Sequence, residues 1–120
     1  VEPLHIADPR IAMAAAGAAR LVVSVRLHGL IFAARTGTAH VGVGYDPKVR
    51  GFAEQTHAPV VRVPVAEDAL WRVVRTRLAA VETDDGATAE ARRVLAERLA
   101  SDAEAGLDAL ADALERATRR

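Results

Sequence analysis

The sequence predicts an α/β fold, with a parallel sheet of about four strands and helices packed against it. Two apolar runs rich in β-branched residues carry this prediction, Leu21–Val25 and His40–Val43. Neither run alternates polar with apolar residues, which is typical of parallel strands covered on both faces. Each run leads through a polar turn into a helical pattern, so strands and helices alternate along the chain, as in α/β proteins.

The composition is that of one globular domain. The 120 residues are 51% hydrophobic and 27% charged, proportions that exclude an intrinsically disordered chain. Only 3% of the residues are aromatic, so we expect a core built from Ala, Val, Leu and Ile.

Charge and cysteine content exclude several classes of function. The 16 Lys and Arg residues balance the 16 Asp and Glu residues, so bulk charge indicates no nucleic-acid partner. The absence of cysteine excludes disulfides and thiolate metal sites. No histidine has a second ligand at metal-binding spacing, so no metal is expected, and His5, His40 and His57 are interpreted as structural or exposed.

The first elements are a short strand and a helix. Leu4–Ala7 is a short apolar run, which we count as the first of the four strands. Asp8 followed by Pro9 is a helix start signal, because Asp caps the first turn and Pro suits the first helical position. The helix is expected from Pro9 to Ala19.

The next units repeat this order. Leu21–Val25 is a strand, and the apolar spacing predicts a helix over Arg26–Arg35 that ends at Thr36-Gly37, since glycine adopts the left-handed terminal conformation. His40–Val43 is the following strand. Asp46-Pro47 repeats the start signal for a helix.

That helix is expected over Pro47–Thr56, with Phe52 as its main apolar anchor. Val60–Val63 is predicted as a short last strand that Pro64 stops. An amphipathic helix is expected over Glu67–Val81, with its arginines, Arg77 included, directed largely outward.

From Ala87 the pattern is helical again, and Ser101 to Glu104 form a capping box that restarts the helix. The box leaves open whether the segment is one helix or two. We divide the chain into two parts, residues 1–86 and a C-terminal helical segment, residues 87–120, packed on the first part or on a partner.

Several chemically capable side chains follow the two confident strands. They are Arg26, His28, Tyr45, Asp46 and Lys48. In open α/β sheets, ligands bind at the carboxyl ends of the strands, and the start of a helix favours an anion. Two adjacent helix N-termini with an Arg, a Lys and a His therefore predict a pocket for a phosphorylated anion.

Each of these residues also has a structural interpretation. Arg26 can form a salt bridge, His28 can satisfy a backbone carbonyl in a core, and Tyr45 can simply pack. For Asp46 the capping role is favoured over a catalytic one.

The segment LVVSVRLHGLIFAARTGTAHVGVGYDPKVRGFAEQ, Leu21 to Gln55, resembles the polysaccharide pyruvyl transferases that act in bacterial cell-wall pyruvylation. The likeness is carried by a strand that ends in Arg-Leu-His, a helix of small residues, and a second strand followed by Tyr-Asp-Pro-Lys-Val. The family fold resembles the two Rossmann-like domains of GT-B glycosyltransferases, of which this chain would be most of the C-terminal one. By implication of this resemblance, residues 1–86 are a partial Rossmann-like donor-binding domain.

The resemblance implies an enzyme that moves the enolpyruvyl unit of phosphoenolpyruvate onto a cell-wall sugar and releases phosphate. The product is a pyruvate ketal, with a role in S-layer anchoring, and no cofactor is needed. His28 would be the general acid or base. Arg26, Leu27, Tyr45 and Lys48 would bind substrate.

The same resemblance implies that an acceptor-binding N-terminal half of the polypeptide is missing, so we expect the chain to be inactive alone. It also implies a cytoplasmic reaction, at or near the inner face of the membrane. Two alternatives stay open: a GT-B donor domain for a nucleotide sugar, and a non-enzymatic helical module that forms a homodimer.

Overall fold

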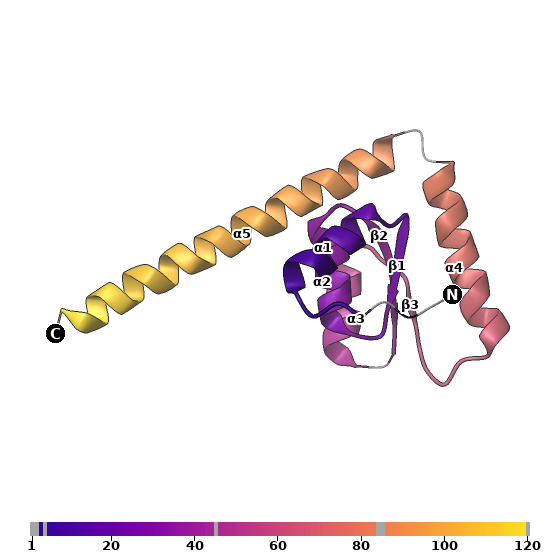
Figure 1. The fold of residues 1–120 in the computed structure, drawn as a ribbon, viewed down its shortest axis with the longest axis horizontal. Helices are drawn as coiled ribbons and strands as arrows, with labels where there is room; N and C mark the ends of the chain where they lie inside the picture. Colours follow the sequence, from indigo (N-terminus) through magenta and orange to yellow (C-terminus); the bar gives the residue numbers. More distant parts are fainter. Residues whose placement is uncertain (1–2, 4, 45, 84–85, 120) are drawn as a thin grey trace.

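The protein is a three-stranded parallel sheet with helices on both faces and a long helix that extends away from it (Figure 1). The computed structural model describes residues 3, 5–44, 46–83 and 86–119. The strands are β1 (Leu21–Ser24), β2 (Ala39–Val43) and β3 (Val60–Val61), in the order β1-β2-β3. The predicted α/β class is confirmed.

The prediction of a strand at Leu4–Ala7 is wrong. Leu4 lies outside the described residues, and residues 5–7 are not in a strand. A strand requires a partner in the sheet, and β1, the nearest strand in sequence, pairs only with β2 among the described residues. The chain turns directly into a helix at Asp8 instead.

Five helices surround the sheet in the described residues: α1 (Pro9–Ala18), α2 (Leu27–Arg35), α3 (Pro47–Gln55), α4 (Glu67–Glu82) and α5 (Ala87–Thr118). Helices α2 and α3 pack on one face with α1 beside α2, and α4 lies on the other side (Figure 1). Their bounds agree closely with those expected from the sequence.

Local chemistry explains where three of these helices begin or end. The Asp8 side chain accepts a hydrogen bond of 2.9 Å from the Arg10 N–H, and the Asp46 side chain accepts one of 2.8 Å from the Lys48 N–H. Gly37 follows α2 with φ +72°, the left-handed conformation that glycine adopts without steric cost. These predictions are confirmed.

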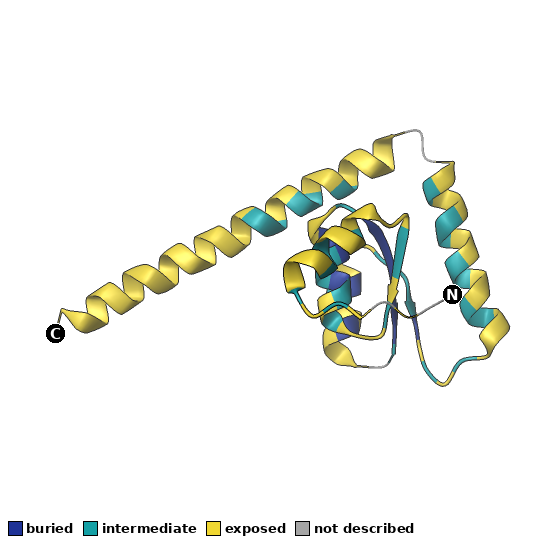
Figure 2. Ribbon diagram, in the orientation of Figure 1, coloured by how far each residue is buried: buried dark blue, intermediate teal, exposed yellow. Residues whose placement is uncertain are grey.

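The core is centred on β2. All five of its residues are buried, and Figure 2 shows this strand enclosed between helices. Leu30 and Ala33 of α2 and Ala53 of α3 are fully buried against it. This matches the low aromatic content, because small aliphatic side chains allow the helices to approach the sheet closely.

The expected anchor of α3 was wrong: Phe52 is only half-buried, and Val49 and Ala53 are the buried residues. The reason lies in β2. A Cβ at Gly42 would lie 3.2 Å from Val49 Cγ1 and 3.3 Å from Leu30 Cδ1. The side chains of Val49 and Leu30 therefore fill the space next to Gly42 that a larger residue would occupy. Contact with Gly42 therefore helps to decide which face of α3 is turned inward.

The apolar residues of α4 that were expected to face inward are half-buried, namely Leu70, Val73, Val74, Leu78 and Val81, whereas Trp71 is exposed. The expectation for Arg77 was wrong, because its side chain is half-buried while Arg72 and Arg75 are exposed. Arg77 lies near the end of α4, where the start of α5 covers it.

Helix α5 is one continuous helix of 32 residues, so the capping box at Ser101 does not restart it. Its first half contacts α2, and Arg92 Nε donates a 3.0 Å hydrogen bond to the Gly37 carbonyl. All of residues 101–119 are exposed (Figure 2). None of the described helices has the length and apolar character needed to cross a bilayer.

One histidine is part of the core. His40 in β2 is 3% exposed, and its Nδ1 lies 2.9 Å from the Thr38 carbonyl and its Nε2 lies 2.8 Å from Thr56 Oγ1. Burial lowers the pKa of His40, and the positive charges of Arg77 and Arg92 lower it further. The lowered pKa favours the neutral ring, and its Nδ1 carries the proton because the Thr38 carbonyl can only accept a hydrogen bond.

We expect the protein to lose stability as the solution is acidified below pH 6.5, the ordinary pKa of histidine. Because the folded-state pKa is lower than the unfolded-state pKa, the unfolded chain binds more protons in this range. The contribution of His40 to the unfolding free energy is complete above pH 6.5 and is lost as the pH falls through its folded-state pKa. Urea unfolding at several pH values measures the slope of the unfolding free energy against pH.

The matched variants are His40→Gln, which should flatten the slope, and His5→Gln, which should leave it unchanged because His5 is exposed. An identical slope for the parent and His40→Gln would contradict the assignment.

Candidate active site

The described residues of the predicted site follow β1 or β2 at one edge of the sheet. Ser24 at the end of β1 is in register with Gly42 of β2, so the residues that follow both strands share this edge. A cavity of about 440 Å³ opens there, lined by Val25, Arg26, Leu27, His28, Asp46 and Val49. The structure thus brings Arg26, Leu27 and His28 together with Asp46.

The start of α2 carries no capping side chain. Arg26 is the N-cap residue, and it makes no side-chain cap hydrogen bond. The first N–H groups of a helix have no intrahelical partner and carry partial positive charge. They face the same edge as the Arg26 guanidinium, and both favour an anion.

The start of α3 is different, because the Asp46 carboxylate already accepts the Lys48 N–H. The Asp46 side chain therefore already occupies one of the first N–H groups of α3, whereas the start of α2 has no side-chain cap. The carboxylate also places an acceptor of hydrogen bonds in the wall of the cavity.

His28 is exposed, and its ring lies against Phe32 with ring centroids 6.5 Å apart and planes tilted by 55°. Within the described part of the chain, neither His28 nor Arg26 forms an ion pair, and neither side chain has a hydrogen bond. The alternative interpretations, a core histidine and a salt-bridged arginine, are therefore not what the structure shows.

A second, more apolar hollow of about 540 Å³ adjoins the first on the side of α1. Its walls include Ala12, Ala15 and Ala16, and Arg26 and His28 line it as well. The two polar side chains therefore stand between a polar cavity and an apolar one.

The remaining predicted residues are less closely placed. Lys48 is exposed on the first turn of α3 and does not line either cavity. Tyr45 lies outside the described residues. In the part of the chain that is described, no three His, Asp or Glu side chains are grouped to hold a metal ion.

Residues 2–47 match the polysaccharide pyruvyl transferase family. The match spans α1, β1, α2 and β2 and includes Arg26, Leu27 and His28, so the resemblance stated for Leu21–Gln55 is confirmed over the residues that the two ranges share. It covers less than half of the chain and ends before Lys48. No curated protein and no solved structure shows a significant match.

Within the pyruvyl transferase match, Ser24 and Gly29 position the site and were missed by the sequence analysis. Ser24 Oγ accepts a hydrogen bond from the Arg26 N–H at 3.1 Å and donates one to the Arg26 carbonyl at 2.8 Å. A Cβ at Gly29 would lie 2.3 Å from that same hydroxyl. The sequence signal that could have indicated these roles is one small residue on each side of Arg-Leu-His, Ser24 before it and Gly29 after it.

We expect Gly29→Ala to lower the free energy of unfolding by about 1–3 kcal/mol, because the new methyl group overpacks the turn. Ser24→Gly removes the hydroxyl and the Cβ that the methyl would meet. In urea unfolding, the double variant should therefore lose less unfolding free energy than the sum of the losses of the two single variants.

The control is Gly51→Ala, a helical glycine with nothing within 4 Å of the added Cβ. It should stabilise the protein by up to about 1 kcal/mol. Full additivity of Gly29→Ala and Ser24→Gly would mean that this contact does not shape the turn.

Proposed function

We propose that this chain binds the donor substrate of a polysaccharide pyruvyl transferase. The proposed reaction moves the enolpyruvyl unit of phosphoenolpyruvate onto a cell-wall sugar and forms a pyruvate ketal. The observation that carries the proposal is the pair Arg26 and His28. Both side chains are unpaired among the described residues, stand at the uncapped start of α2, and lie within the segment that matches this family.

The donor carries two anionic groups, a carboxylate and a phosphate. The guanidinium of Arg26 can bind either group through two parallel hydrogen bonds, and the first N–H groups of α2 add the attraction of the helix dipole. Lys48, exposed on the neighbouring helix, supplies a further cation for the donor. Tyr45 and Leu27 complete the proposed set of substrate-binding residues.

The reaction requires proton transfer at two places. Two sugar hydroxyl oxygens bond to the central carbon of the donor, and the bond from that carbon to the phosphate oxygen breaks. One hydroxyl proton ends on the methylene carbon, which becomes a methyl group, and the other leaves with phosphate. His28 is proposed to give or take one of these protons, a role worth about 10²–10⁴-fold in rate.

The proposal includes a second part of the polypeptide, which would bind the acceptor sugar. The chain alone is then expected to bind donor without transferring it. The reaction would belong to envelope biosynthesis in the cytoplasm, close to the inner face of the membrane.

We expect phosphoenolpyruvate to shift the backbone amide NMR signals of Arg26–Gly29, and Arg26→Met to weaken this binding about tenfold or more. The reason is that a hydrogen bond to a charged group contributes about 1.5–3 kcal/mol, and 1.4 kcal/mol corresponds to about tenfold in affinity. The His28 ring signals should shift in the same titration.

Arg35→Met is the matched control, because Arg35 is an exposed arginine at the opposite end of α2. UDP is the control ligand. Shifts with UDP and none with phosphoenolpyruvate would favour a nucleotide-sugar glycosyltransferase, and an unchanged affinity in Arg26→Met would contradict the proposed donor site.

Exposed leucines in the second half of α5 favour an additional role of the chain in assembly. Leu107, Leu110 and Leu114 are 66%, 56% and 58% exposed, and their spacing places them on one face of the helix. Gly106 and Ala113 lie beside this face, and small residues allow two helices to approach closely. We propose that a second copy of the chain covers it, through antiparallel pairing of the two α5 helices.

Light scattering should then give the mass of a dimer for the parent chain and of a monomer for Leu110→Glu. Ala109→Glu, on the other side of the same helix, is the control and should remain dimeric. A monomeric parent at high concentration would contradict homodimerisation.

A further inference from the structure

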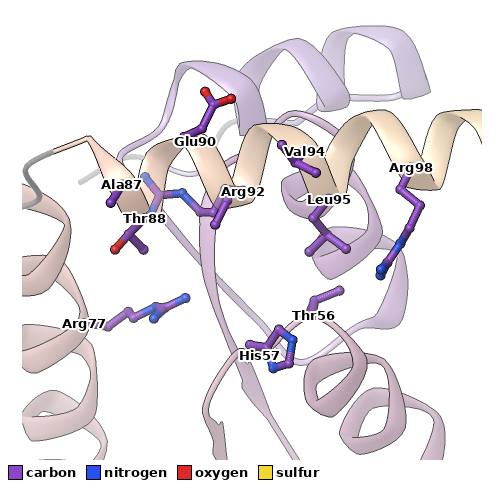
Figure 3. Close-up of a pocket in the computed structure, with 11 residues that line it drawn as sticks. Thr56, His57, Arg77, Ala87, Thr88, Glu90, Arg92, Val94, Leu95 and Arg98 are labelled. Atoms are coloured by element: carbon purple, nitrogen blue, oxygen red, sulfur yellow. The ribbon is translucent and has the colours of Figure 1, made fainter.

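A cavity of about 630 Å³ lies at the opposite edge of the sheet from Arg26 and His28. It is enclosed by the end of α3, the end of α4 and the first half of α5 (Figure 3). Helices α3 and α4 each follow a strand and lead back toward the amino ends of the strands, so this cavity is separate from the proposed donor site. Its volume is in the range of small-molecule sites.

The charged groups around this cavity are mainly cationic. Arg77 reaches into it from α4, Arg98 and Arg92 come from α5, and His57 forms part of its floor (Figure 3). Glu90 is the acidic residue of the lining, and it is engaged by Arg93 and points away from the cavity. Among the described residues of the lining, Arg77 and Arg98 therefore supply positive charge to this space.

Arg77 has an unsatisfied polar atom at this place. Its Nε is buried and has no hydrogen-bond partner among the described residues. Burial and the nearby charge of Arg92 both lower the pKa of Arg77. A buried N–H of a charged group that has no hydrogen-bond partner is unfavourable, and an anion in the cavity would supply the partner.

His57 is held beside the cavity at a steric cost. Its φ is +57°, a conformation in which glycine is favoured over residues with a Cβ. The turn is fixed by two hydrogen bonds, from the His57 N–H to the Glu54 carbonyl at 3.2 Å and from the Ala58 N–H to the Ala53 carbonyl at 2.8 Å. An imidazole, which can donate an N–H to an anion, therefore occupies a position that suits glycine better.

The other walls are largely apolar. Leu95 points down from α5 toward Thr56 and His57 (Figure 3), and alanine side chains of the same helix line the cavity as well. A ligand that fits both parts has an anionic group at one end and an apolar body at the other.

We propose that this cavity binds an organic anion, namely a phosphate monoester or a carboxylate with an apolar body. The charged group would lie between Arg77, His57 and Arg98, and the apolar body would lie against Leu95. The site is independent of the proposed donor site and of the transfer reaction. An occupied cavity would join α4 and α5 through the ligand.

Phenyl phosphate is the probe. Inorganic phosphate and phenol, which correspond to its anionic and its apolar part, are tested separately for comparison. We expect phenyl phosphate to bind at millimolar concentration or below, more tightly than either part, in calorimetry of the whole chain. Amide NMR shifts should fall on residues 56–57, on residue 77 and on residues 87–98. Arg77→Met should weaken binding at least tenfold.

Three variants keep the outcome clear. Arg72→Met is the matched control, since Arg72 is an exposed arginine of the same helix, and it should leave the affinity unchanged. Arg26→Met should also leave it unchanged, which separates this site from the donor site. Arg77→Lys retains a charge and should bind with intermediate affinity.

Without ligand, Arg77→Met should unfold at the same temperature as the parent or a higher one, because a buried N–H without a partner is removed. The proposal is overturned by no detectable binding of phenyl phosphate, by binding that Arg77→Met does not weaken, or by shifts confined to Arg26–Gly29.

Discussion

Complete burial of β2 is the constraint on which the rest of this structure depends. The strand is only five residues long, yet it must be covered by helices on one face and by α4 on the other. Gly42 makes this possible, because Val49 and Leu30 occupy the space that a side chain there would fill. The burial of β2 therefore sets the positions of α2 and α3, and with them the positions of their N-termini at the edge of the sheet.

The two helix N-termini at that edge have opposite chemical character. The start of α3 is satisfied by its own carboxylate, Asp46, whereas the start of α2 is left open beside Arg26. Ser24 and Gly29 hold the open turn close to β1. A difference of one capping residue thus distinguishes a purely structural helix start from one with room for a ligand.

Features that depend on neighbouring residues were predictable from the sequence, and features that depend on distant contacts were not. The cap at Asp46 follows from local hydrogen bonding. The strand expected at Leu4–Ala7 failed because pairing is a property of the whole sheet. Phe52 and Arg77 were assigned to the wrong sides of their helices, since contacts with Gly42 and with α5 decide these orientations. The sequence indicated that Arg26, Leu27, His28 and Asp46 share one edge of the sheet, and they line one cavity there. That Lys48 does not line this cavity depends on how α3 packs, which the sequence alone does not predict.

The exposure of the second half of α5 has a consequence for the local stability of this helix. Residues 101–119 are exposed in a single copy of the chain, so in the monomer they are held in a helix by intrinsic propensity and local side-chain pairs alone, which stabilise short helices only marginally in water. Amide hydrogen exchange of the monomer should therefore be slow where α5 contacts α2 and become faster toward Thr118. This gradient means that the end of α5 can unwind and re-form while the sheet stays folded, because the two are not one cooperative unit.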